Sequence, residues 1–302
     1  MVIKSLFLWL KMTFRYWKTC STICLVAFSV CSLSAEGSDL TVMTFNIRWD
    51  GLDRGAHSWD NRKLDVTVLI EKYAPDLVAL QEASRRQTQY LHDSLHGYES
   101  FSPQHERAKY HAILFRTQRF SLVAQGSFWL VKYSDLPGGT RRCAWVRLRE
   151  TGSGRGIYVY NLHLDGRSPV AHEKSVVTLM EEIRNRKFTD PFLVMGDFNA
   201  VETSRSISYL KGKMPLQGQG GQSRFNLIPL VDTVREIFPT ANSLGTAHGF
   251  RGNLDGGRLD YIFVSEGFEV QNAKVVHDNN NSRYPSDHFP VVVDLQFSKQ
   301  GS

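Results

Sequence analysis

Gly196, Asp197 and Asn199 follow four apolar residues, 192–195, and offer a carboxylate and an amide at the end of that run. A short apolar run bounded by glycine predicts a buried strand. Asp197 and Asn199 are two positions apart, so on an extended chain their side chains project to the same side. Together they could orient or deprotonate a water molecule. An Asx turn that only ends a strand uses the same residue types, so the other polar groups of the chain decide between the two interpretations.

Five further stretches repeat this layout, with an apolar strand pattern and, at one end, a polar group able to bind a metal or a phosphate. These polar residues are Asn46, Glu82, His163, Asp260, Asp287 and His288. A single acid or histidine at the end of a strand is more often an ordinary surface or structural residue. Because six predicted strands each carry such a group at one end, we favour a single site where these strand ends meet.

The elements that must position these residues alternate between strands and helices. A helix with apolar residues at i, i+3, i+4 and i+7 is predicted to begin near Ser58, and a second one near Ser168. The first helix connects the strands before Asn46 and Glu82 in a β-α-β order. Strand patterns cover residues 110–116, 120–131, 143–148 and 157–164. This succession suggests two sheets packed face to face, with helices outside.

Six short motifs carry a resemblance to a known family. They are Thr44-Phe45-Asn46, Leu80-Gln81-Glu82, Asn161-Leu162-His163, Gly196-Asp197-Phe198-Asn199, Arg258-Leu259-Asp260-Tyr261 and Ser286-Asp287-His288. In this order they resemble the endonuclease/exonuclease/phosphatase superfamily of metal-dependent phosphoester hydrolases, and they span residues 44–288. The resemblance implies an α/β fold, a four-layer α-β-β-α sandwich of two mixed sheets packed face to face with helices outside.

Glu82, Asn46 and Asp287 are the predicted metal ligands. Glu82 supplies a hard oxygen ligand, and Mg²⁺ typically takes one or two carboxylates while it keeps waters and substrate phosphate in its shell. Asn46 and Asp287 can complete that shell, so we expect one Mg²⁺ ion, with Mn²⁺ as a substitute. A zinc site is disfavoured because the sequence has no cysteine cluster.

Asp197 is the candidate that orients or deprotonates the attacking water, and Asn199 would hold this water or a non-bridging phosphate oxygen. His288, positioned by Asp260, would donate to the phosphoryl group, because a carboxylate favours the charged form of its histidine partner. His163 is a second donor to the phosphate. An alternative assignment makes His288 the base and His163 the acid, and the sequence leaves this choice open.

Arg48, Arg142 and His248 are the candidates for substrate binding. Nuclease branches of the superfamily that act at damaged DNA carry an acid two residues after the motif asparagine, whereas here that position holds Arg48. The longer pattern, with His248-Gly249-Phe250 and residues 283–288, is more similar to a group of secreted bacterial members. Arg142 is expected to contact phosphate, although a surface position on a strand explains it equally well. For His248 a structural role is the open alternative.

Residues 1–35 differ in composition from the rest of the chain. They hold four basic residues and no acid, then an apolar run near residues 23–30, and small residues before Glu36. This pattern predicts a secretory signal peptide, with an uncleaved anchor as the alternative and Met12 as a second possible start. We therefore expect a secreted or periplasmic protein with one catalytic domain over residues 36–302. Membrane contact is expected only if the segment is retained.

Removal of this segment changes the charge and the cysteine content. Basic residues fall from 36 to 32 against 30 acids, so the excess falls from +6 to +2 and indicates no broad nucleic-acid footprint. Cys143 is then the only cysteine left in the sequence, which excludes an intramolecular disulfide. The mature length suffices for one core, and we expect a monomer without a stable protein partner.

The sequence favours an exported, Mg²⁺-dependent phosphoester hydrolase, and a phosphodiesterase above other phosphoesterases. One alternative is a secreted nuclease that degrades DNA or RNA. A second is an enzyme for inositol phosphates or phospholipids, which would need a basic pocket or an apolar loop that faces a membrane. A third is a non-catalytic binding protein on the same fold, against which the filled set of motif positions argues.

Overall fold

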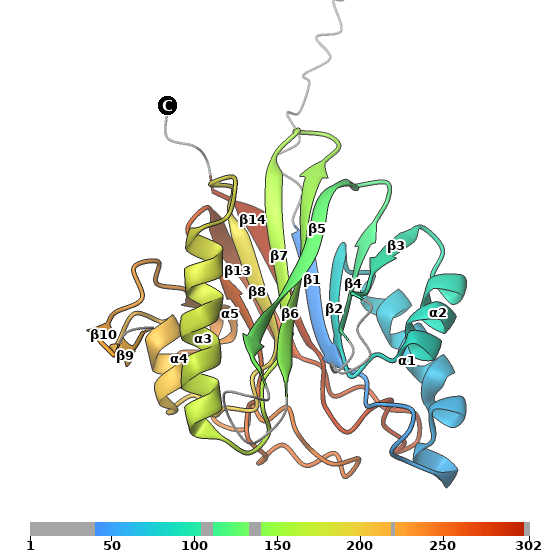
Figure 1. The fold of residues 1–302 in the computed structure, drawn as a ribbon. Coiled ribbons are helices and arrows are strands. Elements are labelled where there is room, and N and C mark those ends of the chain that lie inside the picture. The colour runs from blue at the N-terminus through green and yellow to red at the C-terminus, as the bar shows by residue number, and fades with distance from the viewer. Residues whose placement is uncertain (1–39, 104–110, 133–139, 219–220, 299–302) are drawn as a thin grey trace, which may run out of the picture. The chain divides into compact units, whose positions relative to one another are not determined.

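The computed structural model describes residues 40–103, 111–132, 140–218 and 221–298. Residues 1–35, the predicted signal peptide, lie outside this part of the chain. Two six-stranded sheets dominate the described residues (Figure 1). No helix in the described ranges is long and apolar enough to cross a membrane.

The first sheet carries the motifs nearest the N-terminus and the one nearest the C-terminus. In spatial order it consists of β13 (Phe268–Val275), β14 (Val291–Phe297), β1 (Leu40–Asn46), β2 (Leu77–Gln81), β4 (His111–Arg116) and β3 (Tyr98–Phe101). β1 and β2 are parallel, and the other neighbours are antiparallel. In the parallel pair Asn46 stands opposite Gln81, the residue before Glu82. The predicted β-α-β connection is confirmed, and it brings Asn46 and Glu82 to the same edge.

The second sheet brings three predicted site residues to one level. In spatial order it consists of β11 (Val231–Asp232), β12 (Asp260–Val264), β8 (Phe192–Asp197), β7 (Gly156–His163), β6 (Arg141–Glu150) and β5 (Phe120–Val131). β7 and β8 are parallel. His163 and Asp260 stand opposite Asp197 from the two strands that flank it. The ends of three neighbouring strands therefore meet at the site.

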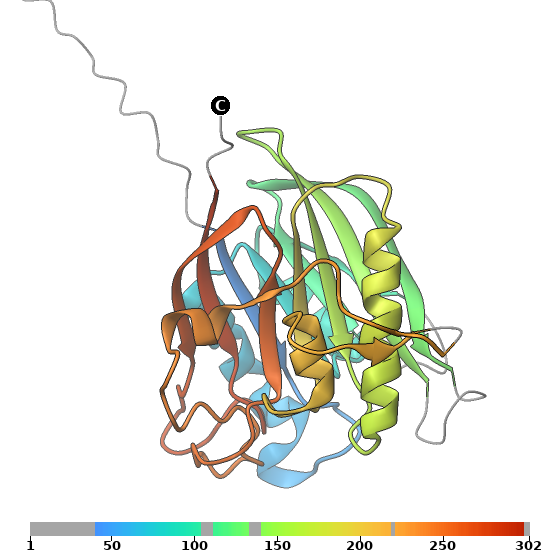
Figure 2. The same ribbon diagram turned by 90° about the vertical axis from the view of Figure 1, so that its left-hand side faces the viewer.

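Helices cover the outer faces of both sheets. α1 (Trp59–Tyr73) and α2 (Arg85–Ser94) lie against the first sheet, and α3 (Pro169–Arg184) and α4 (Arg205–Leu210) lie against the second (Figures 1 and 2). The remaining short elements are η1 (Gly55–His57), α5 (Thr233–Ile237), β9 (Leu216–Gln217) and β10 (Ser223–Arg224). Ser84 begins α2 with a capping box, and Ser168 caps α3 in front of a proline. These caps define where the chain turns away after Glu82 and His163.

Three apolar layers hold the elements together. One lies between the sheets and contains Val42 from the first and Val159 from the second. Another lies between the first sheet and its helices, where Phe45 and Ile70 belong to one cluster. The third joins the second sheet to α3 and α4. The predicted four-layer α-β-β-α sandwich is thus confirmed.

Gly196 lies where β8 passes close to β7. Its φ is 151°, and a side-chain carbon at this position would collide with the backbone carbonyl of Leu162. The close approach of the two backbones therefore requires a glycine here. It allows β8 to deliver Asp197 beside His163.

A polar bridge links the two sheets one residue before Glu82 and two before His163. Nε2 of Gln81 donates to Oδ1 of Asn161 over 2.8 Å. Nδ2 of Asn161 in turn donates to the backbone carbonyls of residues 80 and 112. Both side chains are fully buried, where an unpaired amide would be costly. The bridge therefore favours one alignment of the two sheets near the site.

Candidate active site

Asp197 is the residue on which the predicted site converges. It is the last residue of β8 and is 1% exposed. Nδ2 of Asn46 donates to its Oδ2 over 3.0 Å, and the backbone N–H of Asn199 donates to its Oδ1 over 2.8 Å. Because Asn46 belongs to the first sheet and Asp197 to the second, this contact joins the sheets within the site.

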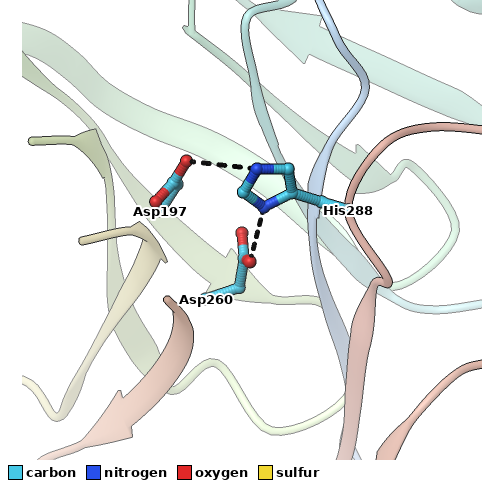
Figure 3. Close-up of side chains that lie close together, drawn as sticks. All are labelled: Asp197, Asp260 and His288. Atoms are coloured by element: carbon cyan, nitrogen blue, oxygen red, sulfur yellow. Dashed lines mark hydrogen bonds and ion pairs between the residues drawn. The ribbon is translucent and has the colours of Figure 1, made fainter. Parts of the chain in front are cut away.

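Two histidines face the same carboxylate. Nε2 of His163 lies 3.4 Å from Oδ2 of Asp197, and Nε2 of His288 lies 4.0 Å from that oxygen. On the other side of its ring, His288 places Nδ1 2.8 Å from Oδ2 of Asp260 (Figure 3). His288 thus stands between two carboxylates, with one ring nitrogen toward each.

The charges around His288 favour its imidazolium form. Burial by itself lowers the pKa of His288, but the charge and the hydrogen bond of Asp260, with the charges of Asp197 and Asp287, raise that pKa to about 10. Burial and the charge of Asp260 raise the pKa of Asp197 to about 7, against the opposing effect of His288. At neutral pH a protonated imidazole therefore stands next to a carboxyl group that can gain or lose a proton.

Arg48 and Trp49 contact all three predicted metal ligands through their backbone N–H groups and the guanidinium of Arg48. Nη1 of Arg48 lies 2.9 Å from Oδ2 of Asp287, and its Nε donates to Asp53 over 2.8 Å. The backbone N–H of Arg48 donates to Oδ1 of Asn46, and the next backbone N–H donates to Oε2 of Glu82. Arg48, a candidate for substrate binding, is thus held by two acids while it also faces the cavity described below.

Three residues that follow strand ends have left-handed backbone conformations. The φ angles are 60° at Arg48, 57° at Glu82 and 48° at Asn199. This region is costly for residues that carry a Cβ atom, and such strain concentrates where function requires a particular side-chain direction. Nothing in the sequence pattern indicated it.

A cavity of about 450 Å³ opens at this edge of the sheets. It is lined by Arg48, Glu82, Arg141, His163, Asp165, Gly166, Arg167, Asp197, Asn199 and His288. The lining combines three carboxylates and two histidines with three arginines. Such a set can move protons and can bind an anion.

Arg142 and His248, the other candidates for substrate binding, do not line this cavity. The guanidinium of Arg142 donates to Ser127 and lies 4.4 Å from the ring centre of Trp129. His248 accepts a hydrogen bond from a backbone N–H and stacks on Phe289 with 3.9 Å between ring centres. Burial lowers the pKa of His248 to about 4, so the ring is neutral. For His248 the geometry favours the structural alternative.

Three charged lining residues were not predicted from the sequence. They are Arg141, Asp165 and Arg167. Arg141 is the neighbour of Arg142 on β6, and adjacent residues of a strand point to opposite faces. Asp165 follows His163 by two positions, a spacing that could have marked it in the same way that Asn199 follows Asp197.

The comparisons with known proteins agree with this architecture. The chain matches the model of the Endonuclease/Exonuclease/phosphatase family over residues 43–288. The crystal structure of a family member from Bacteroides thetaiotaomicron is 26% identical, and the match covers 87% of this chain and 96% of that one with a TM-score of 0.72. A mannosyl-6-phosphatase from the same organism is also 26% identical, with 85% and 100% coverage and a TM-score of 0.71.

A relative with a different described activity matches over a shorter region. A probable RNA exonuclease of Saccharomyces cerevisiae is 25% identical in an alignment of 199 residues that covers 55% of this chain. The match spans only 39% of the length of that relative.

The order of the motifs, the two packed sheets and the family match over most of the sequence all lead to the same assignment. The chain belongs to the endonuclease/exonuclease/phosphatase family and is an enzyme of the class that hydrolyses phosphoester bonds.

Proposed function

We propose that this chain is an exported, Mg²⁺-dependent hydrolase that cleaves phosphodiesters by in-line attack of water on phosphorus. One observation carries the proposal: Oδ2 of Asp197 faces Nε2 of both His163 and His288 in the wall of the cavity. In this mechanism Asp197 orients the attacking water and accepts its proton. Asn199 holds the water or a non-bridging oxygen in line.

His288 donates to the phosphoryl group as negative charge develops there. A pKa of about 10 supports this role over the alternative in which His288 is the base, because a base must be unprotonated at the working pH. Asp260 keeps the proton on Nδ1 and orients the ring through their hydrogen bond. His163 supplies the second donor to the phosphate.

The oxygen donors beside Arg48 fit Mg²⁺. Glu82 and Asp287 offer carboxylates and Asn46 offers an amide oxygen, all hard ligands of the kind that this ion prefers. The carboxylate of Glu82 lines the cavity and is oriented by a backbone N–H. Mg²⁺ bound by these residues would supply Lewis acidity to the phosphoryl oxygens.

A second group of side chains could also hold a cation. Ligand atoms of Asp197, Asp260 and His288 lie within 4.8 Å of one another. Nδ1 of His288 faces Asp260 and Nε2 faces Asp197, an arrangement that suits an imidazole that donates to both carboxylates. We therefore assign the ion to the Glu82 side of the cavity.

Charge balance favours a diester over a monoester. The cations of the site are Arg48, Arg141, Arg167 and protonated His288, with Arg62 behind them, and the acids are Glu82, Asp165 and Asp197 with Asp53, Asp260 and Asp287 behind them. A divalent ion then leaves the site with an excess of about one positive charge. A monoanionic diester then adds less unbalanced charge than a dianionic monoester.

A monoester of a sugar is the second candidate substrate. The observation in its favour is the mannosyl-6-phosphatase that is 26% identical to this chain over 85% of its length. An RNA substrate has weaker support, because the probable RNA exonuclease matches over only 39% of its own length.

A substrate panel tests the proposal. The purified protein would be assayed with bis-p-nitrophenyl phosphate, mannose 6-phosphate, RNA, DNA, phosphoinositides and sphingomyelin, each with Mg²⁺ and with excess chelator. We expect the highest kcat/KM on a diester and no turnover in chelator. A higher kcat/KM on mannose 6-phosphate would show that the substrate is a sugar monoester and not a diester. Turnover that survives chelation would contradict the metal-assisted mechanism.

A further inference from the structure

Arg141 lies in the wall of the catalytic cavity with most of its hydrogen-bonding groups unused. It is the first residue of β6, is 5% exposed and lines the cavity together with Asp197 and His288. A guanidinium has five N–H donors. Within the described ranges, Arg141 makes a single side-chain hydrogen bond, from Nη2 to Oδ2 of Asp165 over 3.2 Å, and its buried Nε has no partner.

Two other buried arginines of this protein are better satisfied. Arg62 is 0% exposed and donates to four backbone carbonyls. The Nε of Arg258 is also without a partner, but its other nitrogens donate to both carboxylate oxygens of Asp232 and to Glu202. A buried charge is costly unless acceptors surround it. Among the described residues Asp165 is the only acceptor for the side chain of Arg141, which lies in a wall of the cavity, and this points to an anionic ligand as the missing partner.

Asp165 holds the guanidinium of Arg141 in this position. Oδ1 of Asp165 accepts the backbone N–H groups of Arg167 and Ser168 over 2.9 and 3.0 Å, so the backbone fixes the carboxylate. Oδ2 is then left to receive Arg141. Burial lowers the pKa of Arg141, while the charge of Asp165 opposes this effect. The group stays cationic at neutral pH because an arginine is not deprotonated in proteins.

We propose that Arg141 binds a non-bridging oxygen of the substrate's phosphoryl group and that Asp165 is the residue that positions it. The inference rests on the proposed phosphoester hydrolysis and places the phosphate between Arg141 and the pair of Asp197 and His288. The planar guanidinium matches a phosphate group with two parallel N–H bonds. Arg167, on the loop after β7, adds positive charge to the same lining.

Inorganic phosphate is the probe, since it carries the recognised group without a leaving group. Its Ki would be measured against hydrolysis of bis-p-nitrophenyl phosphate at saturating Mg²⁺ for the wild type, Arg141→Gln and Arg141→Lys. The matched control is Arg142→Gln, which removes the same charge one position along β6 from a side chain that contacts Ser127 and Trp129 instead of the cavity.

We expect Arg141→Gln to raise the Ki for phosphate about 30-fold and Arg141→Lys about 10-fold, because a point charge keeps the attraction but loses the paired donors. Arg142→Gln should stay within about twofold of the wild type. A Ki that is unchanged in folded Arg141 variants, or that rises equally in Arg142→Gln, overturns the proposal. If Arg141→Gln fails to fold, Arg141→Lys decides the question by the same criterion.

A second readout separates this inference from the proposed function. The rise of Tm that phosphate causes in the Mg²⁺-loaded protein reports binding without turnover, and it should shrink in both Arg141 variants. Phosphate binding that depends on Arg141 in a protein that hydrolyses no phosphoester would contradict the proposed function and support the phosphate position. Hydrolysis combined with phosphate binding that does not depend on Arg141 would contradict the phosphate position alone.

Discussion

Nδ1 of His288 lies 2.8 Å from Oδ2 of Asp260, although 28 positions separate the two residues. Asp260 begins β12 of the second sheet, whereas His288 stands before β14 of the first. The contact therefore exists only when the two sheets are packed together. It couples the fold to the proton chemistry, because the carboxylate that orients the ring also raises its pKa.

Activity should depend on a divalent ion held through Glu82. Glu82→Gln removes the charge but keeps the shape, so the Mg²⁺ concentration for half-maximal activity should rise about 10-fold or more. Titration of activity with Mg²⁺ measures this. Glu99→Gln, at an exposed position on β3, is the control and should leave the titration unchanged. Equal Mg²⁺ requirements in both variants would remove Glu82 from the metal site.

The pH profile of kcat/KM should be bell-shaped between about 7 and 10. The lower limit is the pKa of Asp197, raised by burial and by Asp260, and the upper limit is that of His288, raised by its carboxylate neighbours. Asp260→Asn should move the upper limb to lower pH, because it removes the largest of the effects that raise the pKa of His288. An upper limb that stays in place in this variant would show that another group sets it.

Stability of the metal-free protein should fall as the pH rises from neutral toward 10. A histidine whose pKa is raised on folding stabilises the native state fully below its unfolded value near 6.5, and this contribution is lost as the pH passes through the folded value of about 10. Urea unfolding at several pH values measures the slope. His288→Gln should flatten it, and an unchanged slope would contradict the raised pKa.

The amide bridge between the sheets should matter for stability more than for chemistry. Asn161→Ala removes three buried hydrogen bonds, one from Nε2 of Gln81 and two to the backbone carbonyls of residues 80 and 112, so the free energy of unfolding should fall by about 3 kcal/mol. Asn272→Ala, at an exposed position of β13, should cost less than about 0.5 kcal/mol. Urea unfolding compares the two variants, and similar losses would mean that the bridge contributes little.

The composition of residues 1–35 predicts that the protein is exported. Cleavage before Glu36 should give a mature protein that begins near that residue, because the basic residues, the apolar run and the small residues stand in the order of a signal peptide. N-terminal sequencing of the protein from the exporting cell checks this. A chain that still begins at Met1 or Met12 would favour the uncleaved anchor.

The sequence predicted the fold and the strand ends because both depend on local patterns. Asn46, His163 and Asp197 are each the last residue of their strand, at the point where an apolar run stops. In the parallel pairs β1–β2 and β7–β8, such ends meet at one edge. Local patterns therefore placed these residues at strand ends, and the resemblance of the motifs to a known family supplied their expected roles.

The choice between Arg141 and Arg142 could not be made from the sequence. The choice depends on which face of the sheet each side chain takes. At this end the pairing of β5 with β6 shifts register between Trp129 and Val131, and such a shift is a tertiary feature. His248 has a similar explanation. Its stacking on Phe289 joins residues 41 positions apart, a contact that no local pattern reveals.

A double-mutant cycle on Asp260 and His288 tests the central claim most directly. The two residues act as one unit in the mechanism, so Asp260→Asn should lower kcat/KM about 10²-fold and His288→Ala at least as much. Once the imidazole is gone the carboxylate has nothing left to orient, and the double variant should be no worse than about the His288→Ala variant alone. If the losses in kcat/KM instead multiply in variants shown to be folded, the two residues act independently. That result would contradict the claim that Asp260 orients His288 to donate to the phosphoryl group.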